Sequence, residues 1–211
     1  MFKALISDLD RCLFDPYSVS ITQRSFLEIL NLIEKEIDTE KKEKVRKEIF
    51  KWGLPGIFKR HGISGELQQK ITAMYHVPTV SPEAKPYPDI VVLKELPLFK
   101  ILVTTGLEKF QQSKIDTLHL SEYFNEIIIN KTDGTSNRWT KKRIFREILK
   151  KHFLSPSEVI VIGDSSYDEL IPAKELGMIT VQSLRDNVKK AEGFDYYVTS
   201  LEELKNILKI Q

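Results

Sequence analysis

The sequence predicts an α/β fold in which a doubly wound, mainly parallel sheet carries an inserted α-helical domain. Short apolar segments alternate with helical patterns from residue 89 to residue 209, as expected for parallel strands joined by right-handed helical crossovers. An apolar run at residues 2–7 supplies one more buried strand. Residues 16–81 lie between these parts and show helical spacing without a strand pattern. The helical block is therefore expected to be an insertion after the first strand.

The insertion is expected to be a small helical bundle, because apolar side chains recur at helical spacing in three segments. Gly53, Pro55 and Gly56 are expected to separate the second helix from the third. The proline-rich stretch SPEAKPYPD, residues 81–89, is typical of a linker back to the sheet. The predicted helices are 22–37, 40–52 and 64–76, and the predicted domains are an α/β core of residues 1–15 and 82–211 and a helical domain of residues 16–81.

The elements of the core follow from the alternation of patterns along the rest of the chain. Apolar runs such as KILVT, EIIIN and EVIVI are typical of strands that are covered on both faces. The segments between them have the spacing of the helices that cover such a sheet. We expect strands at 2–7, 100–104, 126–130, 158–162, 178–182 and 195–198, and helices at 89–96, 107–118, 140–152, 168–176 and 200–209.

Composition excludes several classes of partner. Charged residues make up 29% of the chain, but the formal net charge is only +2, so binding to nucleic acid is not expected. The sequence shows neither an apolar run of bilayer length nor a basic leader before an apolar segment, so we expect no membrane partner and a cytoplasmic location. The single cysteine, Cys12, excludes an intrachain disulfide. The sequence carries no indication of oligomeric state.

Polar side chains gather where the predicted strands end, which is where open parallel sheets bind their ligands. Asp8 and Asp10 follow the first strand, and both carboxylates approach one spot if the extended geometry persists. A bound cation, a shared proton or nearby ammonium groups must then offset their repulsion. The other polar residues at this edge are Thr104, Thr105 and Gly106 after the second strand, Asp164 and Asp168 after the fourth, and Lys141 and Lys142 in the helix before the fourth.

This constellation resembles the haloacid dehalogenase-like (HAD) superfamily, and within it the magnesium-dependent phosphatases. DLDRCL is similar to the first motif of that family, VTTG to the second and GDSSYD to the acidic fourth. YPDIVVLKEL and IPAKELGM are similar to the family as well, so the resemblance covers nearly the whole chain. It implies a Rossmann-like core with a helical cap that closes over the site and selects the substrate.

The resemblance also implies roles for the motif residues. Asp8 corresponds to the nucleophile and Asp10 to the general acid/base. Thr104 corresponds to the hydroxyl that binds the transferring phosphoryl group, and Thr105 and Gly106 complete that phosphate-binding segment. Three positions depart from the common pattern, since Cys12 replaces Thr or Val, Thr105 replaces Asn, and the lysine segment lacks Lys-Pro. Cys12 is interpreted as a packing residue.

A lysine is needed to neutralise the charge of Asp8 and of the phosphoryl group. Lys141 is favoured for this catalytic and phosphate-binding role, because Thr140 is a suitable cap that places Lys141 at the start of a helix. Lys142 is the alternative.

A phosphate dianion repels an attacking carboxylate, so a cation must bridge the two. Mg²⁺ suits this role, because it takes oxygen ligands and tolerates one or two carboxylates together with water and substrate. The expected ligands are the Asp8 side chain, the Asp10 backbone carbonyl and the Asp164 side chain, with Asp168 in the outer coordination sphere or as an additional ligand. The expected function is Mg²⁺-dependent hydrolysis of a small phosphorylated metabolite, a sugar phosphate or nucleotide, through an aspartyl-phosphate.

Two other functions are compatible with the same acids. A phosphomutase would return the phosphoryl group to a substrate hydroxyl, and a regulatory protein would bind a phosphorylated metabolite without turnover. Carbon–halogen hydrolysis is disfavoured, because similar dehalogenases generally lack an acid at the position of Asp10 and need no metal. Substrate choice is expected to lie with residues of the helical domain such as Arg24, Phe58, Arg60 and Tyr75.

Overall fold

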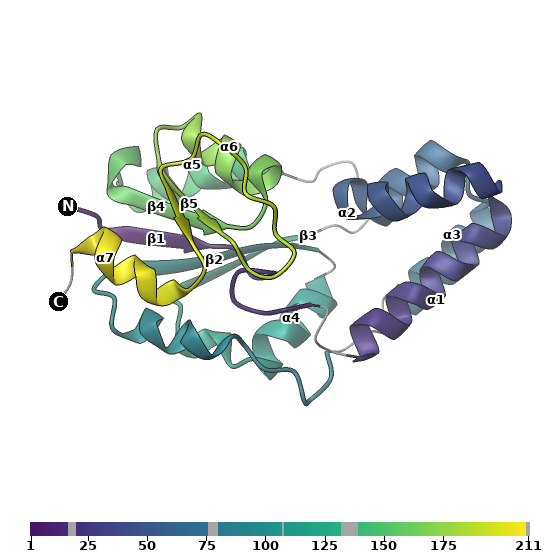
Figure 1. Ribbon diagram of the computed structural model, residues 1–211, viewed down its shortest axis with the longest axis horizontal. Helices are drawn as coiled ribbons and strands as arrows, with labels where there is room; N and C mark the ends of the chain where they lie inside the picture. Colours follow the sequence, from purple (N-terminus) through teal and green to yellow (C-terminus); the bar gives the residue numbers. More distant parts are fainter. Residues whose placement is uncertain (17–19, 76–79, 107, 132–138, 210–211) are drawn as a thin grey trace. The chain divides into compact units, whose positions relative to one another are not determined.

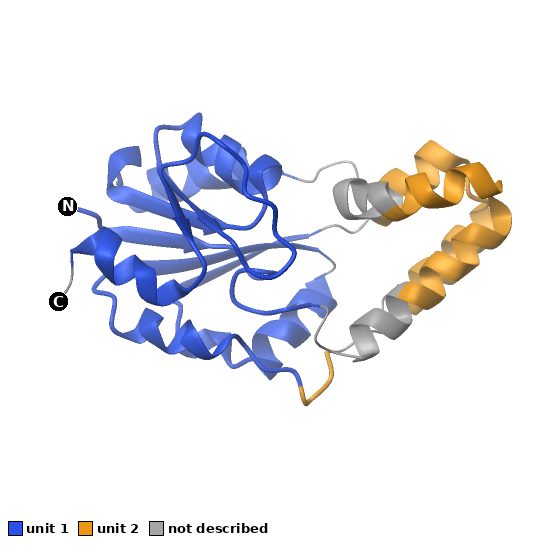
Figure 2. Ribbon diagram, viewed as in Figure 1, with its two compact units in different colours: residues 1–16, 84–211 blue, residues 17–83 orange. Residues whose placement is uncertain are grey.

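The computed structural model describes residues 1–211 except 17–19, 76–79, 107, 132–138 and 210–211. The side chains of residues 20–26, 47–53, 55 and 75 also lie outside the description. The chain divides into two compact units, unit 1 with Met1–Pro16 and Ala84–Gln211 and unit 2 with Tyr17–Glu83 (Figure 2). These boundaries differ from the expected ones by one residue at the first junction and two at the second. No helix in the described ranges is both long and apolar enough to cross a membrane.

Unit 1 is built on a six-stranded parallel sheet with the strand order β3-β2-β1-β4-β5-β6 (Figure 1). The order reverses between β1 and β4, and such a reversal opens a crevice at the carboxyl ends of the two strands. This topology confirms the predicted doubly wound α/β fold. The strands are β1 (Ala4–Ser7), β2 (Phe99–Gly106), β3 (Glu126–Lys131), β4 (Val159–Gly163), β5 (Ile179–Ser183) and β6 (Tyr196–Val198).

Helices cover both faces of this sheet (Figure 1). On one face lie α5 (Lys141–Lys151) and α6 (Ile171–Lys174), and on the other lie α4 (Glu108–Thr117) and α7 (Leu204–Leu208). The α5 helix shows how the sequence produces this arrangement, because its buried apolar residues share one side and pack in one core cluster with strands β1, β2 and β4. The cluster includes Ile144, Phe145 and Ile148 of α5 and Ile6, Ile101 and Val161 of the strands.

Several segments predicted as helices adopt tighter or wider turns. The expected helix 89–96 is the 3₁₀ helix η1 (Pro88–Lys94). The expected helix 168–176 begins with a π-helical turn, η4 (Ser166–Leu170), and continues as α6. The last helix begins as the 3₁₀ turn η5 (Leu201–Glu203), and two further 3₁₀ turns are η2 (Leu120–Glu122) and η3 (Pro156–Glu158).

Unit 2 contains α1 (Ser20–Glu36), α2 (Thr39–His61) and α3 (Gly65–Tyr75). The separator expected at Gly53, Pro55 and Gly56 is wrong, because α2 continues through these residues. Beyond them, Ile57 and Phe58 pack into the buried cluster of unit 2 with Ile33 and Ile71, and this burial outweighs the low helix propensity of glycine and proline. The helix ends instead at Gly62, whose φ of 67° lies in the left-handed region that glycine adopts without a steric penalty.

The two connections between the units run side by side within unit 1. The Tyr87 N–H donates to the Leu13 carbonyl at 2.8 Å. Arg185, which follows β5, donates to the Cys12 carbonyl at 3.2 Å and to Asp89 at 2.9 Å. The chain therefore leaves unit 1 and returns to it through neighbouring segments that one arginine ties together.

Candidate active site

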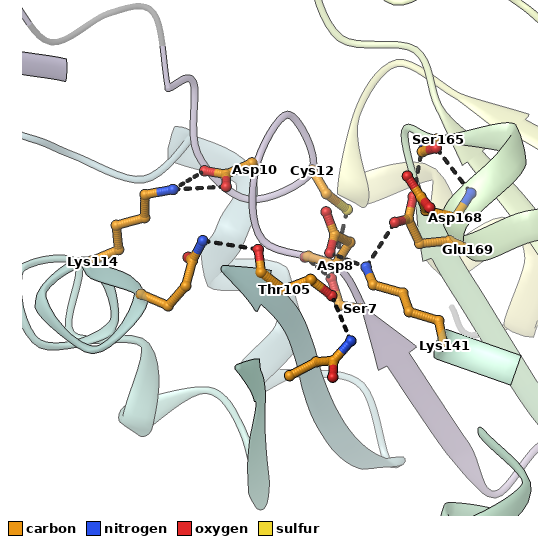
Figure 3. A network of polar contacts seen from close by, with 12 residues as sticks. Ser7, Asp8, Asp10, Cys12, Thr105, Lys114, Lys141, Ser165, Asp168 and Glu169 are labelled. Atoms are coloured by element: carbon orange, nitrogen blue, oxygen red, sulfur yellow. Dashed lines mark hydrogen bonds and ion pairs between the residues drawn. The ribbon is translucent and has the colours of Figure 1, made fainter. Parts of the chain in front are cut away.

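Asp8 directly follows β1 and lies at the carboxyl edge of the sheet. Its N–H donates to the Ile162 carbonyl of β4 at 3.0 Å, which keeps the backbone in line with the strand. The Lys141 ammonium donates to Asp8 Oδ1 at 2.5 Å and to Glu169 Oε1 at 2.7 Å (Figure 3). Burial raises the pKa of Asp8, although the Lys141 charge opposes the rise. Burial alone would lower the pKa of Lys141, but the two carboxylates hold that pKa above its usual value.

The structure distinguishes the two candidate lysines by their place on α5. The Thr140 hydroxyl accepts a hydrogen bond from the Arg143 N–H at 3.3 Å, so it caps the helix and Lys141 occupies the first turn. The Lys141 side chain is 4% exposed. Lys142 is 33% exposed and pairs with Glu175 at 2.6 Å. The favoured Lys141 is therefore the lysine beside Asp8, and Lys142 belongs to the surface.

Three carboxylates converge at this edge. Asp8, Asp164 and Glu169 each offer an oxygen, and these oxygens all lie within 4.8 Å of one another. Asp168, expected near the ion, has an exposed side chain outside this group, and its backbone N–H donates to Ser165 Oγ at 3.1 Å. The apolar runs of the sequence predict Asp8 and Asp164 at this edge, whereas Glu169 was not predicted there.

The turn η4 decides which acid faces the other two carboxylates. It is π-helical, with the Leu170 N–H donating to the Ser165 carbonyl at 3.3 Å. The Glu169 side chain folds back and accepts the Ser165 N–H at 2.9 Å. It passes so close to Gly163 that a Cβ there would lie 3.0 Å from Glu169 Cγ. The sequence offers Asp168 and Glu169 in succession, and only the type of turn selects Glu169.

The charges of this group fit a divalent cation. Burial and the neighbouring Asp8 charge raise the pKa of Asp164 to about 7, and burial raises the pKa of Glu169 to about 8. Within hydrogen-bonding or ion-pair distance lie the Lys141 ammonium and, 3.5 Å from Asp164, the Arg11 guanidinium. Among the described residues, these two positive charges face three carboxylates, and carboxylates held so close together favour either protons or a cation. Three oxygen donors are the chemistry that Mg²⁺ prefers.

Asp10 is directed away from this group. The strand geometry does not persist to Asp10, because β1 ends at Ser7 and Arg11 has a φ of 55°. The Asp10 carboxylate accepts hydrogen bonds from the Lys114 ammonium at 2.7 and 2.8 Å (Figure 3). Lys114 lies on α4 and was not anticipated, since its only signal is its spacing from Phe110 on the buried side of that helix.

The predicted phosphate-binding segment lies at the end of β2, which pairs with β1 in parallel. Thr104 is 2% exposed. Thr105 accepts a hydrogen bond from Asn130 at its hydroxyl, 3.3 Å, and another from Gln111 at its carbonyl, 3.1 Å. Gly106 lies under Gln111, whose amide would overlap a Cβ at that position. The segment thus shares the sheet edge with Asp8 and is fixed by neighbouring amides.

Cys12 is buried and packs 3.6 Å from the Ser7 hydroxyl. Burial raises the pKa of its thiol to about 12. A thiol that stays protonated at neutral pH is a poor nucleophile, and the packing interpretation agrees with this environment.

Residues 5–183 match the family model of the haloacid dehalogenase-like hydrolases. The chain belongs to this family. Over its whole length this HAD-like hydrolase is similar to a glyceraldehyde 3-phosphate phosphatase of Methanocaldococcus jannaschii. The two are 28% identical over 227 aligned positions, which cover 99% of this chain and 98% of the relative.

Solved structures show the same fold. A HAD phosphatase from Thermococcus onnurineus matches this hydrolase with a TM-score of 0.65 and 21% identity, over 98% of both chains. The HAD-type hydrolase YfnB from Bacillus subtilis, solved with bound magnesium, matches with a TM-score of 0.64 and 18% identity, over 99% of both chains. The family match and the phosphatase relative that aligns with nearly the whole chain identify it as a HAD-like phosphatase.

Proposed function

We propose that this enzyme hydrolyses small sugar phosphates, triose phosphates among them, in a Mg²⁺-dependent reaction that passes through an aspartyl-phosphate at Asp8. The observation that carries the proposal is the buried Asp8 carboxylate, which is held by Lys141 at 2.5 Å beside the carboxylates of Asp164 and Glu169. The full-length relative named as a glyceraldehyde 3-phosphate phosphatase supports the choice of substrate class. A single cysteine is consistent with a cytoplasmic enzyme.

In the first half of the reaction, an Asp8 oxygen forms a bond to phosphorus while the bond from phosphorus to the ester oxygen breaks. Asp10 gives its proton to the departing oxygen, so the products are the free alcohol and an aspartyl-phosphate. In the second half, Asp10 takes a proton from water as the water oxygen attacks phosphorus, which releases phosphate and restores the Asp8 carboxylate. Lys141 neutralises Asp8 and the phosphoryl oxygens, and Thr104, Thr105 and Gly106 bind those oxygens at the end of β2.

The side chains of Asp8, Asp164 and Glu169 would hold Mg²⁺ together with the Asp10 backbone carbonyl, so Glu169 takes the role first assigned to Asp168. When bound, Mg²⁺ supplies the positive charge that allows an anionic carboxylate to approach an anionic phosphate. We further propose that unit 2 is the cap that selects the substrate. Phe58 packs in the core of unit 2, so we no longer expect it to contact the substrate. The side chains of Arg24 and Tyr75 lie outside the described residues.

A substrate panel tests this function. We expect the purified chain to release inorganic phosphate from glyceraldehyde 3-phosphate and other small sugar phosphates with Mg²⁺, and to lose this activity in excess EDTA. Asp8→Asn and Asp10→Asn should each lose nearly all turnover while remaining folded. Borohydride reduction of the acid-quenched enzyme should convert phosphorylated Asp8 to homoserine, detectable by peptide mass.

Other outcomes would point to the alternative functions. An isomeric sugar phosphate in place of inorganic phosphate would identify a mutase. Tight binding of a sugar phosphate without turnover would identify a binding protein. Wild-type rates in either Asn variant would refute the assigned roles.

A further inference from the structure

Lys114 has no part in the mechanism above, yet its ammonium is bound to both oxygens of the Asp10 carboxylate (Figure 3). We propose that Lys114 is the positioning residue of the general acid/base, which holds the Asp10 carboxylate apart from the group of Asp8, Asp164 and Glu169. The inference rests on the proposed function, because it assigns a task to Lys114 only if Asp10 transfers protons.

In the contact between Lys114 and Asp10, the lysine is buried and the aspartate is accessible to solvent. The Lys114 side chain is 3% exposed, whereas the Asp10 side chain is 32% exposed. The two nitrogen–oxygen distances, 2.7 and 2.8 Å, are nearly equal, so both carboxylate oxygens are restrained at once. The lysine therefore fixes the direction of the carboxylate. When Asp10 carries the proton that it gives to the leaving group, one oxygen can still accept from Lys114 while the protonated oxygen can face a substrate.

Helix α4 fixes Lys114 in turn. The helix buries one side, on which Phe110, Gln111, Lys114 and Ile115 lie. The Lys114 ammonium lies 4.6 Å from the centroid of the Phe110 ring, a favourable position for a cation over an aromatic face. Gln111, on the same side, donates to the Thr105 carbonyl at 3.1 Å. One helix thus holds both Asp10 and the end of β2.

Stability does not account for a lysine at this position. The Asp10 side chain is 32% exposed, so water can solvate its charge without a partner, and ion pairs that reach solvent contribute little to folding. A methionine cannot supply a charge or a hydrogen bond to Asp10. Asp8 already has its own lysine, Lys141 on α5, and α4 and α5 cover opposite faces of the sheet (Figure 1). Each carboxylate is therefore held from a different side.

The test compares two substrates that differ in their need for a proton. A sugar or glycerol phosphate leaves as an alkoxide that must be protonated, whereas p-nitrophenyl phosphate leaves as a stable phenolate. For Lys114→Met we expect kcat/KM to fall by about 10²-fold on the alkyl phosphate, the size of a general-acid contribution, and by less than about 10-fold on p-nitrophenyl phosphate. Lys114→Arg should recover most of the difference, because it restores a charged donor. Lys94→Met, which removes an exposed pair with Glu122, is the matched control and should leave both rates unchanged.

A double-variant cycle completes the test. If Lys114 acts through Asp10, adding Lys114→Met to Asp10→Asn should slow alkyl phosphate turnover no further. Equal losses on both substrates in Lys114→Met, or additive losses in the double variant, would overturn the inference. If Lys114→Met does not fold, as judged by urea unfolding, Lys114→Gln is measured for the same ratio of losses. A wild-type chain inactive on both substrates would instead refute the proposed function, and the inference with it.

Discussion

Asp8 and Asp10 are two residues apart, yet their carboxylates are bound by different lysines. Lys141 approaches Asp8 from α5, and Lys114 approaches Asp10 from α4. Like charges so close in the chain need compensation, and here two ammonium groups supply part of it. The arrangement also separates the two carboxylates chemically, since the first lies with the buried acids and the second lies outside that group.

Lys141 is expected to be essential for folding stability as well as for turnover. In Lys141→Met, Asp8 and Glu169 lose the ammonium that both contact, and breaking a buried ion pair costs about 3–5 kcal/mol. Urea unfolding at pH 7 measures this loss. Lys142→Met is the control, because an exposed pair contributes about 0–1 kcal/mol. Equal unfolding midpoints for the two variants would contradict the assignment of Lys141.

Stability without metal should fall as pH rises. The pKa of Asp164 is about 7 and that of Glu169 about 8 in the folded chain, above the ordinary values of 3.8 and 4.5. The folded chain therefore keeps protons that the unfolded chain releases. Protonation of the two carboxyl groups favours the folded state, and this contribution to the free energy of unfolding is lost between about pH 4 and pH 8. Mg²⁺ competes with the same protons, so the stabilisation by Mg²⁺ should be larger at pH 8 than at pH 5.5.

Denaturant unfolding with Mg²⁺ or EDTA at the two pH values measures both effects. A Mg²⁺ effect of equal size at pH 5.5 and pH 8 would show that these carboxylates are not the binding groups. Asp164→Asn provides the control, because it removes one of the titrating ligands.

The sequence predicts a site residue well when that residue follows a strand or a helix cap, and poorly when its place depends on turn type or packing. Asp8 and Asp164 follow strongly apolar runs, so their place at the end of a strand is readable from the pattern, and the Thr140 cap places Lys141 in the same way. Glu169 depends on a π-helical turn that has no sequence signature of this kind. Lys114 looks like any helical surface lysine until the packing of α4 is known.

At the level of secondary structure, the end of β4 and the turn η4 together position the Glu169 carboxylate. The close passage of Glu169 over Gly163 requires the absence of a side chain there. Gly163→Ala should displace the Glu169 carboxylate, weaken Mg²⁺ binding and cost about 1–3 kcal/mol from steric overlap. Calorimetric titration with Mg²⁺ and urea unfolding measure the two effects. Gly65→Ala is the matched control, because a Cβ at Gly65 would meet no atom within 4 Å.

The elements themselves were predictable where burial and local propensity agree. All six strands were located within two residues at either end, since each carries an apolar run bounded by polar residues. The course of α2 was not predictable, because glycine and proline at 53, 55 and 56 argue for a break while the packing of Ile57 and Phe58 maintains the helix. Local preference and tertiary burial conflict there, and burial prevails.

For the whole molecule, the division into two units predicts that the core is independent of the insertion. Replacing residues 17–83 with a short Gly/Ser linker should give a folded sheet, because the sheet and its covering helices all belong to unit 1. We expect this variant to retain Mg²⁺-dependent cleavage of p-nitrophenyl phosphate and to lose discrimination among sugar phosphates. Circular dichroism and the ratio of kcat/KM values across the panel measure these outcomes. Unchanged discrimination would contradict the proposed role of unit 2.

The hydrogen bond between Leu13 and Tyr87 has a consequence for how such an enzyme can change in evolution. Because the chain leaves unit 1 and returns to it at adjacent points, the segment inserted between these points can be of any length. Recombination at this junction can exchange the entire insert as one block. New substrate ranges can then be sampled while the acids on the sheet stay untouched.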